Sequence, residues 1–316
     1  MKKSIFLSFI LCLCLIACIP QQVMAQKQSR MEKLLRYLND NDADKWQKNR
    51  EKLDDETKAY YAEDLSLMDV LNDLWNGQSE QAATLYFGCY EKAAQSNFPG
   101  ICEGEKIPLS QIRDKADQSI INLLEASKDK IPFSRALLDS IHATEYPVDS
   151  AMLQRLQNIR EVALLEGMLK TPTPIIYQTY VKEYPNGKFI AQVNASENVR
   201  LYQLVKTAPT PANFKAFFED PEMQKYYQDR GPRPYLAEVR TLYDDFLFQR
   251  IDSLKKEGNA TAIRQIIDDY KNTPYLSTGA RTHLNDLEYL SEKADFELLK
   301  PAIVNSESLG LLHTQV

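Results

Sequence analysis

Adjacent carboxylates are the residues of this 316-residue chain whose type is best suited to acid–base chemistry. Two carboxyl groups that flank a bond can act as general acid and general base, as they do in glycoside cleavage. The candidate pairs are Asp54-Asp55, Asp244-Asp245 and Asp268-Asp269. Such pairs are common on the solvated faces of helices, and no feature of the sequence makes them converge. We therefore predict that they are surface groups and that the chain has no catalytic residues.

Metal and nucleotide chemistry lack their usual patterns in this sequence. The three histidines, His142, His283 and His313, have no partner at the spacing of a zinc-binding His-Glu-x-x-His motif. The chain also has no Walker loop, no Gly-x-Gly-x-x-Gly run and no Gly-x-Ser-x-Gly nucleophile elbow. We therefore expect no metal site, no cofactor and no enzymatic activity.

Tyrosines are the side chains that could form a binding surface. Tyr226, Tyr227 and Tyr243 lie in the C-terminal half, with Tyr235 between them. Their rings could line a groove for a peptide or a glycan. Tyrosine is equally suited to packing between helices, where the ring is buried and the hydroxyl reaches the edge. The pattern favours packing and leaves a binding surface as the alternative.

The N-terminal residues have the order of an export signal. Lys2 and Lys3 precede an apolar run over residues 5–19, and a small-residue cleavage site ends at Ala25. This order predicts a secretory signal over residues 1–25 that is removed from the mature protein. The segment over residues 15–18 also resembles a lipobox, which would place a lipid on Cys18 and tether the chain to a membrane. Soluble export is favoured, and lipidation at Cys18 is the alternative.

Only two of the five cysteines, Cys89 and Cys102, lie outside this signal. In an exported protein, two thiols at this separation favour one disulfide that closes a loop between them. The chain-entropy model assigns such a loop about 3 kcal/mol. Two buried thiols are the alternative, because Cys89 also occupies a helical core position.

Charge and glycine content exclude several classes of protein. The formal net charge is −6 at pH 7, and loss of Lys2 and Lys3 with the signal would make it −8. An acidic chain lacks the basic face that nucleic-acid binding requires. The 10 glycines among 316 residues are few against an average of about 7 %. This scarcity disfavours barrels, sandwiches and glycine-dependent nucleotide folds, and it favours helices.

A segment that recurs three times in the C-terminal half sets the predicted architecture. The copies lie over residues 173–183, 210–220 and 262–270, and after a turn each leads to a second signature that begins at Phe189, Tyr235 or Tyr275. Two helices repeated at a period of roughly 35–50 residues are typical of an α-solenoid. We therefore predict an all-α fold of stacked helical hairpins that bury their apolar stripes against one another.

The ends and apolar faces of these helices can also be predicted. Thr173 and Thr210 suit the N-cap position, and Pro174 and Pro211 suit the first helical position, where no N–H is needed. One face of each first helix should be buried. Its members are Tyr177, Tyr180 and Val181, then Phe214, Phe217 and Phe218, then Ile263, Ile266 and Ile267.

The N-terminal half has helical periodicity as well. Apolar residues recur at helical spacing over residues 29–95 and again over residues 109–165. Between them, residues 96–108 contain Pro99, Gly100, Gly104 and Pro108, a composition typical of a loop. The predicted organisation is a signal over 1–25, a helical region over 26–165 with the disulfide loop, and a helical-repeat array over 166–316.

Two segments resemble tetratricopeptide-like repeats. Gly77, Ala82, Tyr86 and Cys89 match the turn and second helix of such a hairpin. The run over residues 184–189, Tyr-Pro-Asn-Gly-Lys-Phe, is similar to the turn in exported repeats of Gram-negative envelope proteins, and the resemblance covers mainly residues 170–292. It implies stacked hairpins and a protein-binding habit, and it carries no catalytic residue across.

These observations predict an exported, non-enzymatic adaptor or scaffold of the bacterial envelope. Its partner would be another envelope protein or a peptide, bound on the surface of the repeats. We expect it in the periplasm, or at the outer membrane if Cys18 is lipidated, and we expect no nucleic-acid partner. A helical protein that binds or processes glycans is the alternative.

Overall fold

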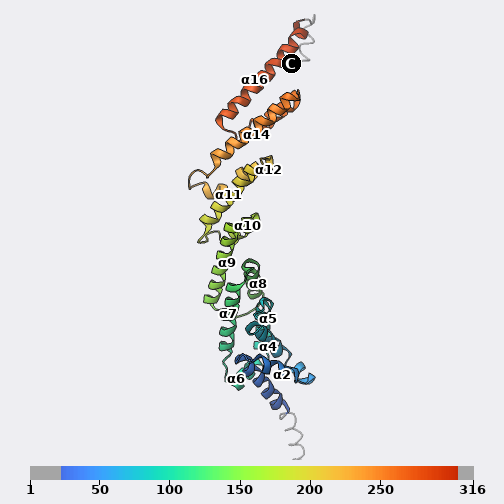
Figure 1. The fold of residues 1–316 in the computed structure, drawn as a ribbon, viewed down its shortest axis with the longest axis vertical. Coiled ribbons are helices and arrows are strands. Elements are labelled where there is room, and N and C mark those ends of the chain that lie inside the picture. The colour runs from blue at the N-terminus through green and yellow to red at the C-terminus, as the bar shows by residue number, and fades with distance from the viewer. Residues whose placement is uncertain (1–22, 305–316) are drawn as a thin grey trace, which may run out of the picture. The chain divides into compact units, whose positions relative to one another are not determined.

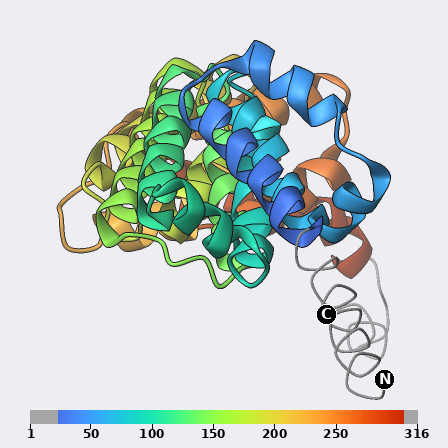
Figure 2. The ribbon, with the colours of Figure 1, turned by 90° about the horizontal axis from the view of Figure 1, so that it is seen from below.

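The computed structural model describes residues 23–304, and all regular secondary structure within this range is helical (Figure 1 and Figure 2). This confirms the predicted all-α class. Most of the predicted signal, with Cys18 in it, and His313 lie outside the described residues. Within residues 23–304, no helix combines the length and the apolar character that a membrane span requires.

The chain divides into two compact units, Met1–Glu166 and Gly167–Val316. In the first unit residues 23–39 are helical. They are followed by α2 (Ala43–Glu51), α3 (Asp55–Tyr60), α4 (Ala62–Trp75), α5 (Glu80–Ala94), α6 (Phe98–Glu105), α7 (Leu109–Ala126) and α8 (Lys130–His142). The boundary falls within α9 (Ser150–Lys170). The second unit contains α10 (Pro174–Glu183), α11 (Ile190–Thr207), α12 (Pro211–Glu219), α13 (Pro221–Tyr227), α14 (Leu236–Lys256), α15 (Ala260–Tyr270) and α16 (Thr278–Val304).

A hydrophobic core built around the α4–α5 hairpin organises the first unit. Tyr86 and Phe87 of α5 are fully buried in it. The turn between the two helices requires a glycine, because a Cβ at Gly77 would lie 2.9 Å from the Asp73 carbonyl oxygen. Ser79 then begins α5 by accepting a hydrogen bond from the Ala82 N–H at 3.2 Å. The predicted hairpin and its turn are confirmed.

The prediction of a loop over residues 96–108 is wrong, because α6 occupies most of this stretch. Pro99 lies in the first turn of α6, where a missing N–H breaks no helical hydrogen bond. Phe98 and Ile101 are buried in the core of the unit. Lys106, with φ 57°, ends the helix. Burial of one apolar face therefore outweighs the turn-forming composition of a short segment.

Both cysteines expected to form a disulfide are free thiols in the structure. Cys89 on α5 is half-buried, with its Sγ 3.5 Å from the Ser66 Oγ on α4. Cys102 on α6 is buried, and burial raises the pKa of its thiol to about 12. The structure thus has the alternative arrangement of two separate thiols, because Cys102 lies on the buried face of the helix that replaced the expected loop.

Helix caps begin the repeated helices of the second unit at the predicted residues. Thr173 accepts from the Ile176 N–H at 3.3 Å, and Thr210 accepts from the Asn213 N–H at 3.3 Å. A proline follows each cap, at the start of α10 and of α12. In the third copy Asn259 caps α15 by accepting from the Ala262 N–H at 3.1 Å.

The predicted apolar faces of these helices are largely buried. Tyr177, Tyr180 and all three phenylalanines of α12 are buried, as are Ile266 and Ile267 of α15, whereas Val181 and Ile263 are half-buried. Most of these helices pack on a neighbour in sequence, α10 on α11, α11 on α12, α14 on α15 and α15 on α16, and α11 also contacts α13 and α14.

The second copy differs from the others by an added helix, α13. A single turn is predicted between the segment over residues 210–220 and Tyr235, whereas the structure ends the first helix at Glu219 and adds α13 over Pro221–Tyr227. Pro221 disfavours a helical conformation in the residue before it, and Asp220 accordingly has φ −57° and ψ 114°. Asp220 then caps α13 by accepting from the Met223 N–H at 2.8 Å. This added helix shapes the candidate site.

Candidate functional site

The paired carboxylates serve local structure. Asp54 caps α3 by accepting from the Thr57 N–H at 2.8 Å, and this bond lowers its pKa. Asp244 accepts from the Ser277 N–H at 3.3 Å. Asp268 pairs with Lys271 at 2.9 Å. Each of these three pairs therefore has a member engaged with its own neighbourhood.

No group of three or more His, Cys, Asp or Glu side chains in the described part of the chain could hold a metal ion. His142 is exposed at the end of α8, and His283 lies with its ring 4.8 Å from that of Phe248. His142 is therefore surrounded by solvent, and His283 packs against an aromatic ring.

The three tyrosines proposed for a binding surface separate into two environments. Tyr243 of α14 is 5 % exposed, and its ring packs edge-on against Phe214 at 5.0 Å. Burial raises its pKa. Tyr226 and Tyr227 of α13 are half-buried neighbours with ring centroids 5.0 Å apart, and the Arg230 guanidinium lies 4.4 Å from the Tyr226 ring. Tyr243 is therefore part of the packing between helices, whereas Tyr227 lines a surface groove.

We call this hollow the basic groove. It has a volume of about 730 Å³ and lies between α13, the loop before α14, the first turns of α14 and the segment before α16. Its aromatic wall includes Phe218, Tyr227 and Tyr275, and its cationic residues are Lys225, Arg233 and Arg240. None of the residues that line it is Asp or Glu. In a chain with 44 acidic and 38 basic residues, this composition is unusual.

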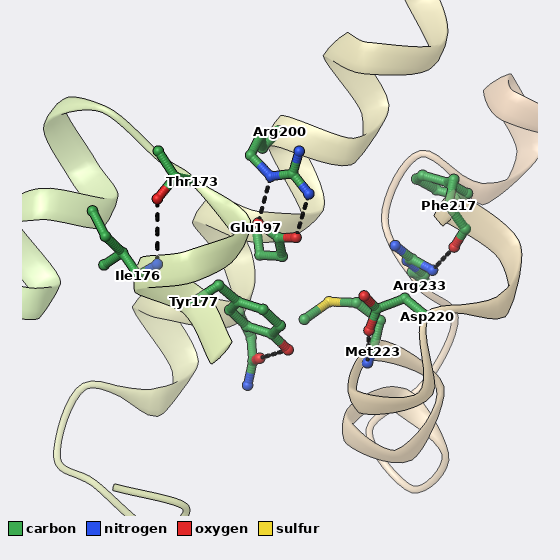
Figure 3. A network of polar contacts seen from close by, with 10 residues as sticks. Thr173, Ile176, Tyr177, Glu197, Arg200, Phe217, Asp220, Met223 and Arg233 are labelled. Carbon is green, nitrogen blue, oxygen red and sulfur yellow. Dashed lines mark hydrogen bonds and ion pairs between the residues drawn. The ribbon is translucent and has the colours of Figure 1, made fainter. Parts of the chain in front are cut away.

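Contacts from two preceding helices hold Arg233 in place, and Figure 3 shows the one from Phe217. Its Nε donates to Asn198 Oδ1 on α11 at 2.6 Å, and its Nη1 donates to the Phe217 carbonyl oxygen at the end of α12. The guanidinium also lies 3.9 Å from the centre of the Phe217 ring, a cation–π arrangement. Asn198 is 1 % exposed and donates to the Pro234 carbonyl oxygen at 3.2 Å. The position of this arginine is therefore fixed.

Two guanidinium nitrogens at the basic groove have no partner within residues 23–304. They are the buried Arg233 Nη2 and the buried Arg240 Nε. Desolvation lowers the pKa of Arg233, which nevertheless stays charged at neutral pH. A buried charge without full compensation is unfavourable. The groove can therefore gain free energy by taking up an anion.

Tyr235 holds the loop that carries Arg233. It has φ 63°, a left-handed conformation that is uncommon outside glycine. Its ring stacks on that of Tyr202 with centroids 4.4 Å apart and planes 11° apart. Tyr202 in turn donates to Glu238 at 2.8 Å. This stacking compensates for the strained backbone and anchors the loop to α11.

A second hollow, the acidic groove, lies between α10, α11 and α12 and has a volume of about 410 Å³. Glu197 and Arg200 of α11 form a two-pronged ion pair there with N···O distances of 2.6 and 2.7 Å (Figure 3). Glu197 is 2 % exposed. Beside it, the Tyr177 hydroxyl donates to Asn194 Oδ1 at 3.0 Å. The charge of Glu197 is thus compensated within the fold.

Sequence reasoning missed Arg233 and Arg240. The only signal for Arg233 is the segment Gly231-Pro232-Arg233-Pro234. Prolines on both sides restrict the backbone of the arginine, which is a way to present a side chain at a fixed place. The composition of this segment by itself predicts only a turn. For Arg240, one of several charges on a long helix, the sequence contains no signal.

Comparison with models of known protein families, with curated proteins and with solved structures found no match for this chain. The function therefore has to be argued from the geometry alone.

Proposed function

We propose that this protein is a non-enzymatic adaptor that binds a peptide segment of another protein on its second unit, whose stacked hairpins form an α-solenoid of tetratricopeptide-like type. Support for the solenoid comes from three capped hairpins whose apolar faces are buried and whose helices pack on their neighbours in order. Arrays of this kind present extended surfaces for other proteins.

The observation that carries the binding role is the basic groove. Folded proteins usually pair buried charges, because an uncompensated one is costly. Here a fixed arginine keeps one buried nitrogen without a partner in the described structure, in a groove that also exposes apolar surface. Such a combination of apolar walls and few placed polar groups is typical of ligand sites.

Export and the envelope location are part of the proposal and rest on the sequence signal. Mass spectrometry of the mature N-terminus tests both routes. A chain that starts at Gln26 supports soluble periplasmic export, and a lipid-modified Cys18 supports a tether at the outer membrane. An intact Met1 in purified protein from its native cells would contradict export.

Selection from a random peptide library tests the adaptor role. The full mature chain is immobilised, and displayed peptides are enriched on it and competed with free peptide. We expect peptides that bind the wild type and lose binding when Tyr227→Arg crowds the basic groove. The control is Tyr289→Arg, at an exposed residue of α16 outside both grooves. Failure to enrich any peptide, together with binding of polysaccharide fragments in a parallel screen, would replace the adaptor role by the glycan alternative.

A further inference from the structure

We infer that the basic groove recognises an acidic peptide segment, whose Asp or Glu carboxylates contact Arg233 and Arg240 and whose apolar neighbours pack on Tyr227 and Tyr275. This inference rests on the proposed function and names the class of peptide. Its basis is charge complementarity within a defined hollow of the second unit.

The first argument is the balance of charge. Lys225, Arg233 and Arg240 line the groove, and no acidic residue lines it. No ion pair joins any of these three side chains to a carboxylate in the part of the chain that the structure describes. Elsewhere in the same unit Arg200 pairs with Glu197 and Lys271 pairs with Glu288. The groove is therefore a place where positive charge remains available to a ligand.

The second argument is preorganisation. Asn198, the Phe217 carbonyl and the Phe217 ring already hold Arg233. A ligand therefore does not have to order this side chain, which removes part of the entropic cost of binding. A planar guanidinium presents its donors in a rigid fork that matches a carboxylate. A carboxylate in the groove would be attracted by the charge of this guanidinium without breaking either existing hydrogen bond.

The third argument is the apolar wall. The Tyr275 ring stacks on Phe218 with centroids 4.3 Å apart and planes 4° apart, and its hydroxyl donates to Glu219. The exposed prolines Pro221 and Pro274 extend this surface. These residues offer apolar contact close to the cations. A peptide in which acidic and apolar residues alternate would use both parts of the groove.

The remaining charge of the protein disfavours other polyanions. The chain has a net charge of −6, and the acidic groove, which shares Pro221 with the basic groove, places Glu222 nearby. A nucleic acid needs cations along an extended path, whereas a short acidic segment needs them only at one place. Peptide side chains fit this confined site.

Fluorescence anisotropy with a labelled 12-residue peptide of alternating Glu and Leu tests the inference. The matched probe carries Gln in place of each Glu. We expect the Glu peptide to bind the wild-type chain at least tenfold more tightly than the Gln peptide. Higher salt should weaken the binding of the Glu peptide, because exposed charges are screened. An amidated C-terminus should leave its affinity unchanged, since side-chain carboxylates are the recognised groups.

Arg240→Gln is the diagnostic variant. The Nε of Arg240 makes no ion pair or hydrogen bond within the described residues, so its removal breaks no such contact. We expect a loss of affinity of about tenfold, which corresponds to about 1.4 kcal/mol. Arg250→Gln is the matched control on α14, an exposed residue outside both grooves with the same change of charge. Its affinity should equal that of the wild type.

The outcomes separate this inference from the adaptor role. Equal binding of the Glu and Gln peptides, or equal loss in Arg240→Gln and Arg250→Gln, overturns the inference. If library selection also yields groove-binding peptides without carboxylates, the adaptor role stands and only the ligand class is wrong. If no library peptide binds, both fail. Preferential binding of RNA or a phosphorylated glycan over the Glu peptide would assign the groove to another anion.

Discussion

The acidic and basic grooves of the second unit share Pro221 yet treat their charges in opposite ways. In the acidic groove, Glu197 is compensated by two contacts from Arg200 at 2.6 and 2.7 Å. In the basic groove, Arg233 and Arg240 each keep a buried nitrogen without a partner within the described residues. A charged hollow is therefore a binding candidate where the fold leaves its charges uncompensated. The next four experiments test that distinction.

Glu197→Ala should have the largest effect on stability. It removes the carboxylate from a buried pair and leaves Arg200 half-buried without its partner. Breaking such a pair typically costs about 3 kcal/mol. Because the chain has two units, local unfolding should be followed by hydrogen exchange of the α11 amides. Glu222→Ala, an exposed acid of the same groove, is the control and should change protection little. Equal effects of the two variants would mean that the pair contributes nothing to the fold.

Asn198→Ala should come next, because this buried amide connects α11 to the loop of the basic groove. It would leave Arg233 Nε and the Pro234 carbonyl oxygen without their partner, which we expect to cost about 2 kcal/mol. Urea unfolding monitored by exchange in α14 measures this. Asn198→Asp instead adds a carboxylate beside Arg233. It should weaken binding of the acidic peptide, so unchanged affinity in Asn198→Asp would argue against Arg233 as a ligand contact.

The first unit also contains a buried carboxylate, that of Asp117. Unlike Glu197, it has no two-pronged ion pair with an arginine among the described residues. Asp117 of α7 is 8 % exposed and accepts from the Tyr146 hydroxyl at 2.5 Å. Burial raises its pKa from 3.8 to about 6, while the Tyr146 bond and Arg113 oppose the rise. The native state thus holds this proton more tightly than the unfolded chain does.

The contribution of Asp117 to the free energy of unfolding should therefore be fully present below about pH 4 and be lost as the pH rises toward 6. The slope is at most about 1.4 kcal/mol per pH unit for one proton. Urea unfolding of wild type and Asp117→Asn from pH 4 to 7 isolates the effect, because other carboxylates titrate in both proteins. A difference between the two that does not vary with pH would show that the pKa of Asp117 is not raised.

Arg240→Gln should have the smallest effect on stability, within about 0.5 kcal/mol, because no ion pair to Arg240 exists among the described residues. Thermal unfolding measures it, with Arg200→Gln as the matched change in the acidic groove. The second variant should be clearly less stable, since it leaves Glu197 buried and unpaired. Equal losses in the two variants would make Arg240 a structural residue and remove the contrast between the grooves.

Local signals in the sequence were sufficient for the all-helical class and for the starts of α10 and α12. Thr173 and Thr210, each followed by proline, cap α10 and α12 as predicted, because capping depends on residues only three positions apart. The all-helical class follows from apolar spacing, which is equally local. The turn at Gly77 follows from composition for the same reason.

Only the tertiary structure decided which groups are paired and which are free. The helix α6 formed where prolines and glycines indicated a loop, since Phe98 and Ile101 are buried in the core. The partner of Arg233 lies 35 positions away at Asn198, and no spacing rule connects them. A side chain is compensated or uncompensated according to what packing brings within about 3 Å of it, and that depends on residues distant in the sequence. The caps of α10 and α12 were therefore determined by short-range chemistry, whereas α6 and the basic groove arose only when the helices packed together.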